Sequence, residues 1–422
     1  PVVGLAVGEL WRINAPSCCP LQSRPRGRPT GHRHGAGDQG MQQAGGQFRL
    51  LIYSHDTFGL GHLRRCRAIA HALVRKRRDL SVLILSGSPI IGSFSFRTRV
   101  DFVRIPGVIK LKDGDYQPLS LDIGLEAILS LRGKIIRHTA EAFAPHLLLV
   151  DKEPLGLRGE VRETLALLKA RRVPTVLGLR DIMDEPGQLA EEWERKNAVR
   201  ALADFYDAIW VYGLPQICNT LEGVALPPSV EGKVRYTGYL RRDPVPRQGS
   251  PLFASPINQG EYLLVTTGGG GDGAMLIDWV LRAYEDDPHP QYPALLVLGP
   301  FMHSSLQADF MRRVERLSHV HAITFEANIE NLMAEAAGVV AMGGYNTFCE
   351  ILSFDKPALI VPRTEPRLEQ LIRASRAQAL GLCRMLDAEG DISSKKMTAA
   401  LQALPAQPKP SNVQIPGLLD GL

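Results

Sequence analysis

One loop of this sequence combines two glycines with a histidine, between a predicted strand and a predicted helix. It reads Ser-His-Asp-Thr-Phe-Gly-Leu-Gly-His and ends at His62. Gly59 and Gly61 would let the backbone approach a ligand closely, and the helix would direct free N–H groups toward it. Histidine titrates near neutral pH, so His62 is the best candidate for a general base, with Asp56 second. A tight turn capped by His62, with Asp56 in a structural role, is the alternative.

A second loop, between another strand and helix, is rich in glycine. Residues 266–273 read Thr-Thr-Gly-Gly-Gly-Gly-Asp-Gly. Gly268, Gly269 and Gly270 would form a backbone-lined anion site that suits a diphosphate. The loop is not a P-loop, because the Lys-Ser/Thr pair is absent, and no acidic ribose ligand follows at the dinucleotide-binding spacing. A flexible surface loop is the alternative.

A third loop reads Met-Gly-Gly-Tyr-Asn-Thr-Phe-Cys-Glu and ends at Glu350. Its paired glycines, Gly343 and Gly344, end a predicted strand. Asn346 or Thr347 could satisfy the exposed N–H groups of the next helix. Glu350 lies four residues after Asn346, on the same helical face, where its carboxylate could accept hydrogen bonds from ribose hydroxyls. The alternative for Glu350 is a solvated helix charge.

Two more polar side chains, Glu369 and Gln370, begin a later helix. They follow a predicted strand at 358–361 and a polar loop. In open α/β sheets, ligands bind at the carboxyl edge of the strands. We therefore expect this segment and the two preceding loops to face the same ligand.

Two sheets are needed to position these loops. Short apolar runs typical of buried parallel strands alternate with helical segments, and the alternation restarts after a break at 234–242. The predicted strands are 48–53, 81–86, 147–151, 175–179 and 208–212, then 262–267, 294–298, 322–325, 338–342 and 358–361. The sequence thus predicts an α/β fold with two Rossmann-like domains.

We expect four segments along the chain. Residues 1–47 are crowded with Pro, Gly, Arg and Gln and cannot offset their ordering entropy, so we expect a disordered or non-native extension, with Met41 as the native start. Residues 48–240 form the predicted acceptor domain. Residues 241–404 form the predicted donor domain, and residues 405–422 an extended tail.

Composition narrows the functional classes. The 422 residues are 45% hydrophobic and 22% charged, as in ordinary soluble proteins. Much of the net charge of +5 lies in residues 1–40, so we expect no clustered basic face and no nucleic-acid partner.

The compartment is expected to be the cytoplasm. No run approaches 18 apolar residues, no signal-peptide pattern is present, and the six cysteines form no C-x-x-C pair. Residues 90–109 mix Phe, Ile and Arg. That pattern fits either peripheral contact with the inner membrane face or an ordinary strand-and-loop region.

The three loops, in this order, resemble those of GT-B glycosyltransferases related to the peptidoglycan N-acetylglucosaminyltransferase and the processive diacylglycerol glucosyltransferases. A bacterial group of predicted glycosyltransferases is the best match. The resemblance spans about residues 48–385 and is tightest at 341–376, where GGYNTFCEIL, KPALIVPR and EQLIRA occur. It implies a GT-B fold, with two Rossmann-like domains facing across a cleft. It also implies inverting transfer of a hexosyl group from a nucleotide-diphosphate sugar, UDP-linked above all, without a metal or other cofactor.

The resemblance also assigns roles to matching residues. It implies that the base is His62, that the ribose ligand is Glu350, and that Phe325 lies near the nucleobase. It implies that the diphosphate is held by Gly268–Gly271, Gly343, Gly344, Asn346 and Thr347. Glu369 and Gln370 would reach the donor sugar. Relatives often have two amides or Asp-Gln there, so Glu369 leaves the identity of the sugar open.

Two rival functions remain. The residues Gly61, His62, Arg65 and Cys66 also resemble nucleotide-sugar hydrolases, in which the histidine activates water. A non-catalytic nucleotide-sugar sensor or partner subunit would keep Glu350 but would not need His62. The acceptor, whether glycan, lipid or small molecule, cannot be named from the sequence.

Overall fold

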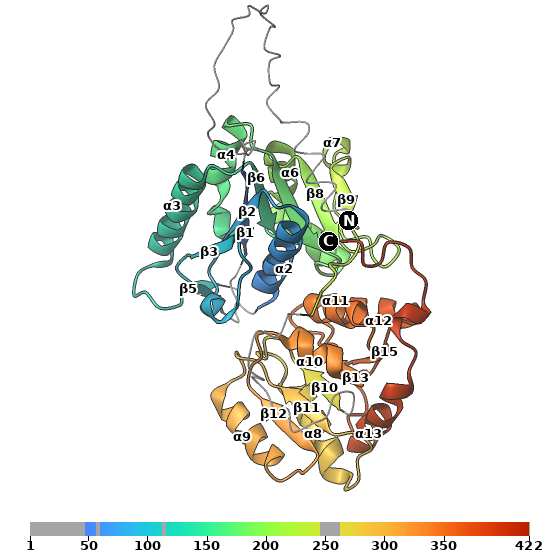
Figure 1. The fold of residues 1–422 in the computed structure, drawn as a ribbon. Coiled ribbons are helices and arrows are strands. Elements are labelled where there is room, and N and C mark those ends of the chain that lie inside the picture. Colours follow the sequence, from blue (N-terminus) through green and yellow to red (C-terminus); the bar gives the residue numbers. More distant parts are fainter. Residues whose placement is uncertain (1–46, 56–59, 112–114, 245–261, 422) are drawn as a thin grey trace, which may run out of the picture.

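The computed structural model describes residues 47–55, 60–111, 115–244 and 262–421 (Figure 1). Asp56 and Gly59, two of the predicted site residues, lie outside the described residues. So do residues 1–46 of the predicted extension.

The N-terminal domain contains a parallel sheet of seven strands in the order β3-β2-β1-β6-β7-β8-β9. Its strands are β1 (Phe48–Ser54), β2 (Leu80–Ser86), β3 (Val100–Arg104), β6 (Leu147–Asp151), β7 (Thr175–Arg180), β8 (Ala208–Tyr212) and β9 (Val234–Tyr236). Its helices are α2 (Gly61–Lys76), α3 (Leu125–Phe143), α4 (Arg162–Ala170), α5 (Pro186–Arg195), α6 (Ala198–Phe205) and α7 (Pro228–Glu231). A small antiparallel pair, β4 (Val108–Lys110) and β5 (Tyr116–Pro118), precedes α3.

The C-terminal domain contains a second parallel sheet, in the order β12-β11-β10-β13-β14-β15. Its strands are β10 (Leu263–Thr266), β11 (Ala294–Val297), β12 (Val320–Ile323), β13 (Gly338–Ala341), β14 (Ala358–Ile360) and β15 (Arg384–Met385). Its helices are α8 (Ala274–Asp286), α9 (Ser304–Val314), α10 (Ile329–Glu335), α11 (Tyr345–Ser353), α12 (Glu369–Ala379) and α13 (Ser394–Ala403). The two parallel α/β domains agree with the predicted fold class.

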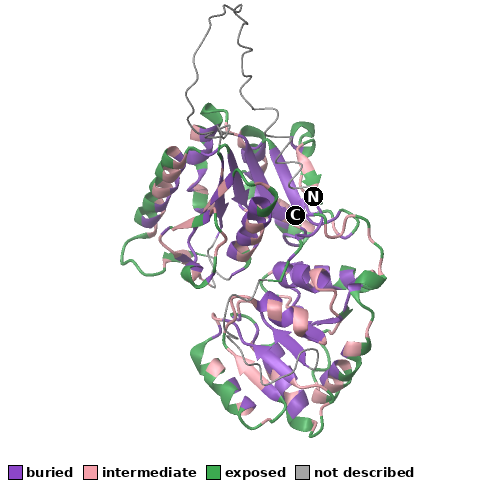
Figure 2. Cartoon of the chain, in the orientation of Figure 1, coloured by how far each residue is buried: buried purple, intermediate pink, exposed green. Residues whose placement is uncertain are grey.

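The central strands are buried because helices cover both faces of each sheet, as a parallel sheet requires (Figure 2). One apolar core continues from one domain into the other. In it, the ring of Tyr239 lies 6.0 Å from that of Tyr345 and 5.2 Å from that of Phe348. The domains are therefore packed together and do not merely share a linker.

Helices α10, α11 and α12 lie on the side of the C-terminal domain that faces the N-terminal domain (Figure 1). The elements that follow β1 and β7 contact the C-terminal domain here, since Gly61, the first residue of α2, accepts from Asn346 of α11, and Asp181, directly after β7, accepts from Arg373 of α12. The carboxyl edges of both sheets therefore border one interface. No helix in the described part of the chain is long and apolar enough to cross a membrane.

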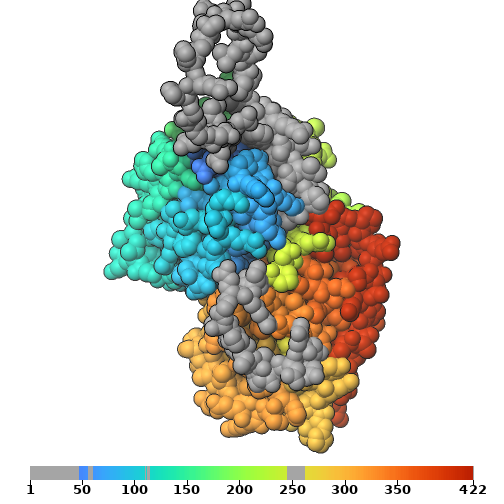
Figure 3. Space-filling model, viewed as in Figure 1, coloured from blue at the N-terminus to red at the C-terminus, as the bar shows by residue number. Residues whose placement is uncertain are grey.

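The last residues of the chain return to the N-terminal domain (Figures 1 and 3). After α13 come two 3-10 turns, Leu404–Ala406 and Pro410–Asn412. Tyr239 N then donates to Leu418 O at 2.8 Å, and Gly421 N donates to Tyr239 O at 3.2 Å. Residues 405–421, predicted to be extended, thus form a second connection between the domains.

Candidate active site

The centre of the candidate site is a contact between His62 and Asp151. β1 and β6 are neighbouring parallel strands, so the helix that follows β1 begins beside the last residue of β6. His62 Nδ1 lies 2.5 Å from Asp151 Oδ2. A carboxylate only accepts, so Nδ1–H donates, and Nε2 keeps its lone pair. This tautomer is the one a general base needs.

The charges around this pair keep the carboxylate ionised and the imidazole neutral. Burial would raise the pKa of Asp151, but Arg65 and His62 lower it to about 2. Arg65 donates from Nε and Nη2 to the two carboxylate oxygens, each at 2.8 Å. Burial lowers the pKa of His62, and Asp151 only partly opposes that effect. At neutral pH the site therefore holds a neutral His62 beside a negative Asp151.

Sequence reasoning missed Asp151. It placed this residue at the end of a predicted strand, LLLVD, without giving it a role. The available signal was a carboxylate at the carboxyl end of a wholly apolar strand, where an unpaired charge would be costly to bury. What the sequence alone did not reveal was its partner, 89 positions away along the chain.

Next to His62 lies another histidine, His55, which is buried. The two rings meet edge to face at 5.6 Å, and burial lowers the pKa of His55 well below its usual value. Below it, the Tyr53 hydroxyl donates to Glu160 at 2.6 Å, and Arg132 donates twice to the same carboxylate at 2.6 Å. These hydrogen bonds hold the buried side chains beneath the site in fixed positions.

Across the interface, Asn346 binds the backbone beside His62. Its Nδ2 donates to Gly61 O at 2.8 Å, while its Oδ1 accepts from Arg242 Nη2 at 2.9 Å. Asn346 thus connects the His62 loop with α11.

Next to Asn346, the N-terminus of α11 has no side-chain cap. Gly343 has a positive φ of 79°, and its carbonyl accepts from Arg373 at 2.8 Å. A Cβ at Gly344 would meet no atom within 4 Å, so open space adjoins the backbone here. Thr347 follows in the first turn of α11 and is buried. This arrangement suits an anion held by backbone N–H groups.

The predicted ribose ligand, Glu350, is buried and already engaged. Arg64 of α2 donates to its Oε1 at 2.5 Å, and also lies 3.4 Å from Glu330. Among the described residues, Oε2 of Glu350 has no hydrogen-bond partner. One carboxylate oxygen thus pairs across the interface and the other is free to accept.

The predicted glycine-loop residues and Phe325 have the following surroundings. Gly268 has a positive φ of 69° and open space beside it, whereas Gly270 packs against Leu298 O and Gly299. Gly269 O accepts from Phe301 N at 2.9 Å. The ring of Phe325 meets that of Phe94, from the N-terminal domain, at 5.9 Å.

Glu369 and Gln370 begin α12 and are both buried. Glu369 accepts from Arg363 Nη2 at 2.8 Å, and Gln370 Oε1 accepts from Arg363 N at 3.2 Å. Oε2 of Glu369 has no partner in the described part of the chain. The pair is therefore held in place with one acceptor oxygen left over.

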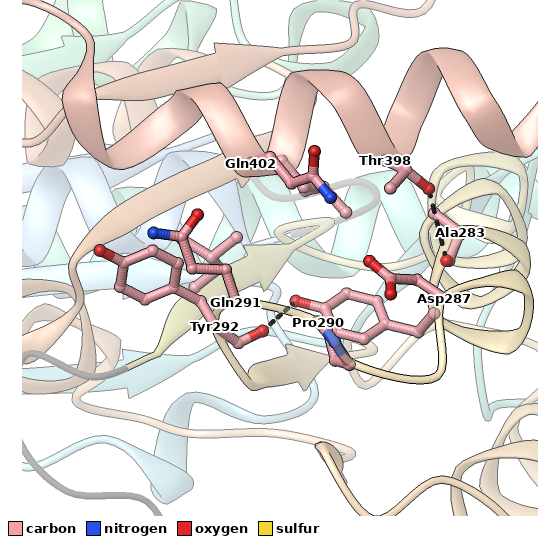
Figure 4. Close-up of a pocket in the computed structure, with 10 residues that line it drawn as sticks. Ala283, Asp287, Pro290, Gln291, Tyr292, Thr398 and Gln402 are labelled. Carbon is pink, nitrogen blue, oxygen red and sulfur yellow. Dashed lines mark hydrogen bonds between the residues drawn. The ribbon is translucent and has the colours of Figure 1, made fainter.

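A small cavity of about 20 Å³ lies elsewhere in the C-terminal domain, between α8 and α13 (Figure 4). It borders Leu263, the first residue of β10, and so lies at the edge of the sheet opposite the glycine loops. Its size suits about one water molecule. It is not a substrate site.

Comparison with known proteins identifies the class of enzyme. The glycosyltransferase family 28 C-terminal domain matches residues 263–412. An uncharacterised glycosyltransferase of Methanosarcina acetivorans is 25% identical over 354 residues, which cover 78% of this chain and 83% of that protein. The chain is a glycosyltransferase. Its closer kinship to the peptidoglycan and diacylglycerol enzymes stays a prediction.

Solved structures with similar folds are GT-B glycosyltransferases. A UDP-glucosyltransferase from Polygonum tinctorium superposes with a TM-score of 0.57 at 14% identity, over 85% of this chain and 90% of that one. Phytolacca americana UGT2, solved with UDP-2-fluoro-glucose and pterostilbene, gives 0.56 at 13% identity, over 85% and 90%. The GT-B fold predicted for the glycosyltransferase is thereby confirmed.

Proposed function

We propose that this glycosyltransferase moves a hexosyl group from a UDP-sugar to an acceptor hydroxyl, with inversion at the anomeric carbon and without a metal ion. The observation that carries the proposal is the 2.5 Å contact between His62 Nδ1 and Asp151, at the interface of the two domains. UDP is the proposed nucleotide because the Phytolacca protein was solved with UDP-2-fluoro-glucose and the Polygonum protein is named a UDP-glucosyltransferase.

In this mechanism His62 is the general base. Its Nε2 takes the proton of the acceptor hydroxyl while that oxygen forms a bond to C1 of the sugar. The bond between C1 and the diphosphate oxygen breaks on the opposite face, and its electron pair leaves with the UDP. Asp151 stabilises the imidazolium that results, as in other His–carboxylate pairs.

The C-terminal domain supplies the proposed donor site. Backbone N–H groups at Gly344 and the start of α11 hold the diphosphate and stabilise its charge as it leaves. Gly268–Gly270 close over it, Glu350 accepts from the ribose, and Phe325 lies near the base. Glu369 and Gln370 bind hydroxyls of the transferred sugar.

The test is donor turnover by the purified full chain. UDP-, GDP- and dTDP-sugars are incubated with and without glycan, lipid and small-molecule acceptors, and release of the nucleoside diphosphate is followed. We expect acceptor-dependent release from a UDP-sugar, at least 100-fold slower in His62→Gln. His138→Gln, which changes an exposed histidine of α3, is the matched control and keeps full activity.

The product's anomeric configuration, read by NMR, tests inversion. Retention would contradict the mechanism. Release that needs no acceptor would favour the hydrolase, and nucleotide binding without turnover would favour the sensor.

A further inference from the structure

Two cations near Asp151 are largely shielded from solvent and have only long contacts: Lys152 Nζ lies 3.4 Å from Glu153, and Arg180 Nη2 donates to Met183 O at 3.5 Å. Lys152 directly follows Asp151 at the end of β6, and Arg180 ends the neighbouring strand β7. Their side chains are only 13% and 16% exposed. Both therefore lie at the carboxyl edge of the N-terminal sheet, which borders the domain interface.

Three other arginines at this interface have close carboxylate partners. Arg65, Arg363 and Arg373 each donate to a carboxylate oxygen at 2.8 Å or less. Arg180 Nη1, in contrast, lies 3.8 Å from Glu369 Oε1, beyond hydrogen-bond distance, and Arg363 already occupies that oxygen. The Nε of Arg180 has no hydrogen-bond partner among the described residues.

Lys152 is in a similar position. Its Nζ lies 3.4 Å from Glu153 Oε1, and Lys196 binds the other oxygen of that carboxylate at 2.9 Å. Burial lowers the pKa of Lys152 to about 8 and that of Arg180 to about 10. Each cation thus lowers the stability of the fold, since its charge is desolvated without a full partner.

The backbone of Lys152 supports a functional role. Its φ is +67°, a left-handed conformation that a non-glycine residue adopts at a cost. The turn is fixed because Lys152 N donates to Gly178 O at 2.8 Å. Such strain is concentrated at functional sites.

We propose that Lys152 and Arg180 form a subsite for a carboxylate group carried by one of the two sugars at the reaction centre. The inference rests on the proposed transferase function. A guanidinium presents a planar fork that matches a carboxylate, and a lysine beside it adds a second charge. The substrate would be a uronic acid.

The diphosphate of the donor is a less suitable occupant. Its proposed loops belong to the C-terminal domain, whereas both cations belong to the N-terminal domain, and Lys152 directly follows Asp151, the partner of the base. Arg180 also approaches Glu369, which we assign to the transferred sugar. Two sources of the carboxylate remain, the transferred sugar and the acceptor, and the experiment separates them.

The experiment measures binding by calorimetry to the full chain and to Arg180→Met, Lys152→Met and Arg137→Met. The last variant changes a half-exposed arginine of α3 and is the matched control. The donor arm compares UDP, UDP-glucose and UDP-glucuronate. The acceptor arm compares p-nitrophenyl glucuronide with p-nitrophenyl glucoside, without nucleotide.

We expect the charged ligand to bind at least 10-fold more tightly than the neutral one in one arm. The arm in which this preference occurs identifies whether the transferred sugar or the acceptor carries the carboxylate. The preference should fall below 3-fold in Arg180→Met and Lys152→Met and persist in Arg137→Met. UDP affinity should not change. The melting temperatures of both subsite variants should equal or exceed that of the wild type.

Three results would overturn the inference. The first is equal affinity for charged and neutral ligands in both arms. The second is an equal loss of affinity for UDP itself in Arg180→Met, which would assign the arginine to the diphosphate. The third is a lower melting temperature in both variants with the ligand preference intact. If the wild type binds no nucleotide but still prefers the glucuronide, the proposed use of a UDP-sugar donor is wrong, whereas the carboxylate subsite is supported.

Discussion

Arg64 of the N-terminal domain donates to Glu350 of the C-terminal domain at 2.5 Å, in a buried pair that spans 286 positions of the chain. The free oxygen of Glu350 and that of Glu330 are both buried without partners in the described part of the chain. We therefore predict that recognition of the ribose, which we assign to Glu350, depends on a residue from the opposite domain. Arg64 binds one oxygen of Glu350, and the other would accept from the ligand.

This relationship predicts that Arg64→Gln weakens discrimination at the ribose. Without Arg64, the pKa of Glu350 rises above its present value of about 7, and the neutral carboxyl accepts hydrogen bonds more weakly. We expect wild type to prefer UDP over 2′-deoxy-UDP by about 10-fold, as befits a hydrogen bond to a charged group. In Arg64→Gln the preference should nearly vanish. Calorimetry with UDP and 2′-deoxy-UDP measures this preference, and Arg137→Gln is the control. An unchanged preference in Arg64→Gln would contradict the assignment of Glu350 to the ribose.

A second prediction concerns stability and pH. Burial raises the pKa of Glu350 to about 7, although Arg64 opposes the shift. The folded state thus holds this proton more tightly than the unfolded chain, in which Glu titrates near pH ~4.3. Its stabilising contribution is complete below that value and is lost as pH rises through about 7. Glu350→Gln removes this loss.

Relative to wild type, Glu350→Gln should therefore gain about 1–3 kcal/mol of stability as pH rises from about 5 to about 8. Melting temperatures of both proteins at several pH values measure the change. The informative quantity is how the stability difference between Glu350→Gln and wild type changes with pH. Its sign at any single pH is not informative, because the glutamine also leaves Arg64 with a weaker partner. A stability difference between the two proteins that stays constant from about pH 5 to about pH 8 would show that the pKa of Glu350 is not raised.

A third prediction concerns Asp151→Asn. An asparagine does not fix the Nδ1–H tautomer of His62 and does not stabilise the imidazolium, so kcat should fall by about 10²- to 10⁴-fold. The melting temperature should fall too, because Arg65 loses both acceptors and stays buried. Asp204→Asn, at an exposed position of α6, is the matched control.

The pH profile of the wild type adds a check on this pair. Burial lowers the pKa of His62, so activity should rise with pH, and the midpoint of that rise should lie below pH 6.5, the ordinary pKa of histidine. A rise in activity whose midpoint lies above pH 6.5 would indicate that a group other than His62 is the base.

A fourth prediction separates folding from binding at Gly344. Its φ is −58° and a Cβ would meet no atom within 4 Å, so Gly344→Ala should leave the melting temperature unchanged. The methyl group would nevertheless intrude on the proposed diphosphate, and affinity for UDP should fall at least 10-fold. Gly390→Ala, also in open space, should change neither quantity. If Gly344→Ala binds UDP as tightly as wild type, the diphosphate does not bind at the N-terminus of α11.

The sequence was sufficient to predict the fold because buried parallel strands are continuous apolar runs. β1 and β10, for example, are evident from hydrophobicity alone. Strand β3 was not delimited, although residues 90–109 were interpreted as either a membrane contact or a strand-and-loop region, because it lies at the edge of its sheet and carries Asp101 and Arg104. Exposed edge strands lose the apolar pattern on which such predictions depend.

The candidate site was predictable only where local pattern sufficed. Glycine loops and a histidine at a helix start are visible in a short window, and these assignments stay predictions until ligands are tested. Asp151, Arg64 and Arg180 were missed because their significance arises from partners 89 to 286 positions away. Topology, and not spacing, brings these charges together.

The returning C-terminal segment has a consequence for engineering and for evolution. By position in the sequence, residues 405–421 follow the C-terminal domain, yet Leu418 and Gly421 hydrogen-bond to Tyr239 beside the N-terminal sheet. A chimera that exchanges C-terminal domains at a single junction would also replace this segment, and the new segment would not match the N-terminal domain against which it must pack. Successful recombination of this enzyme therefore requires two crossovers, one near residue 244 and one before residue 413, so that each domain keeps the chain that it folds with.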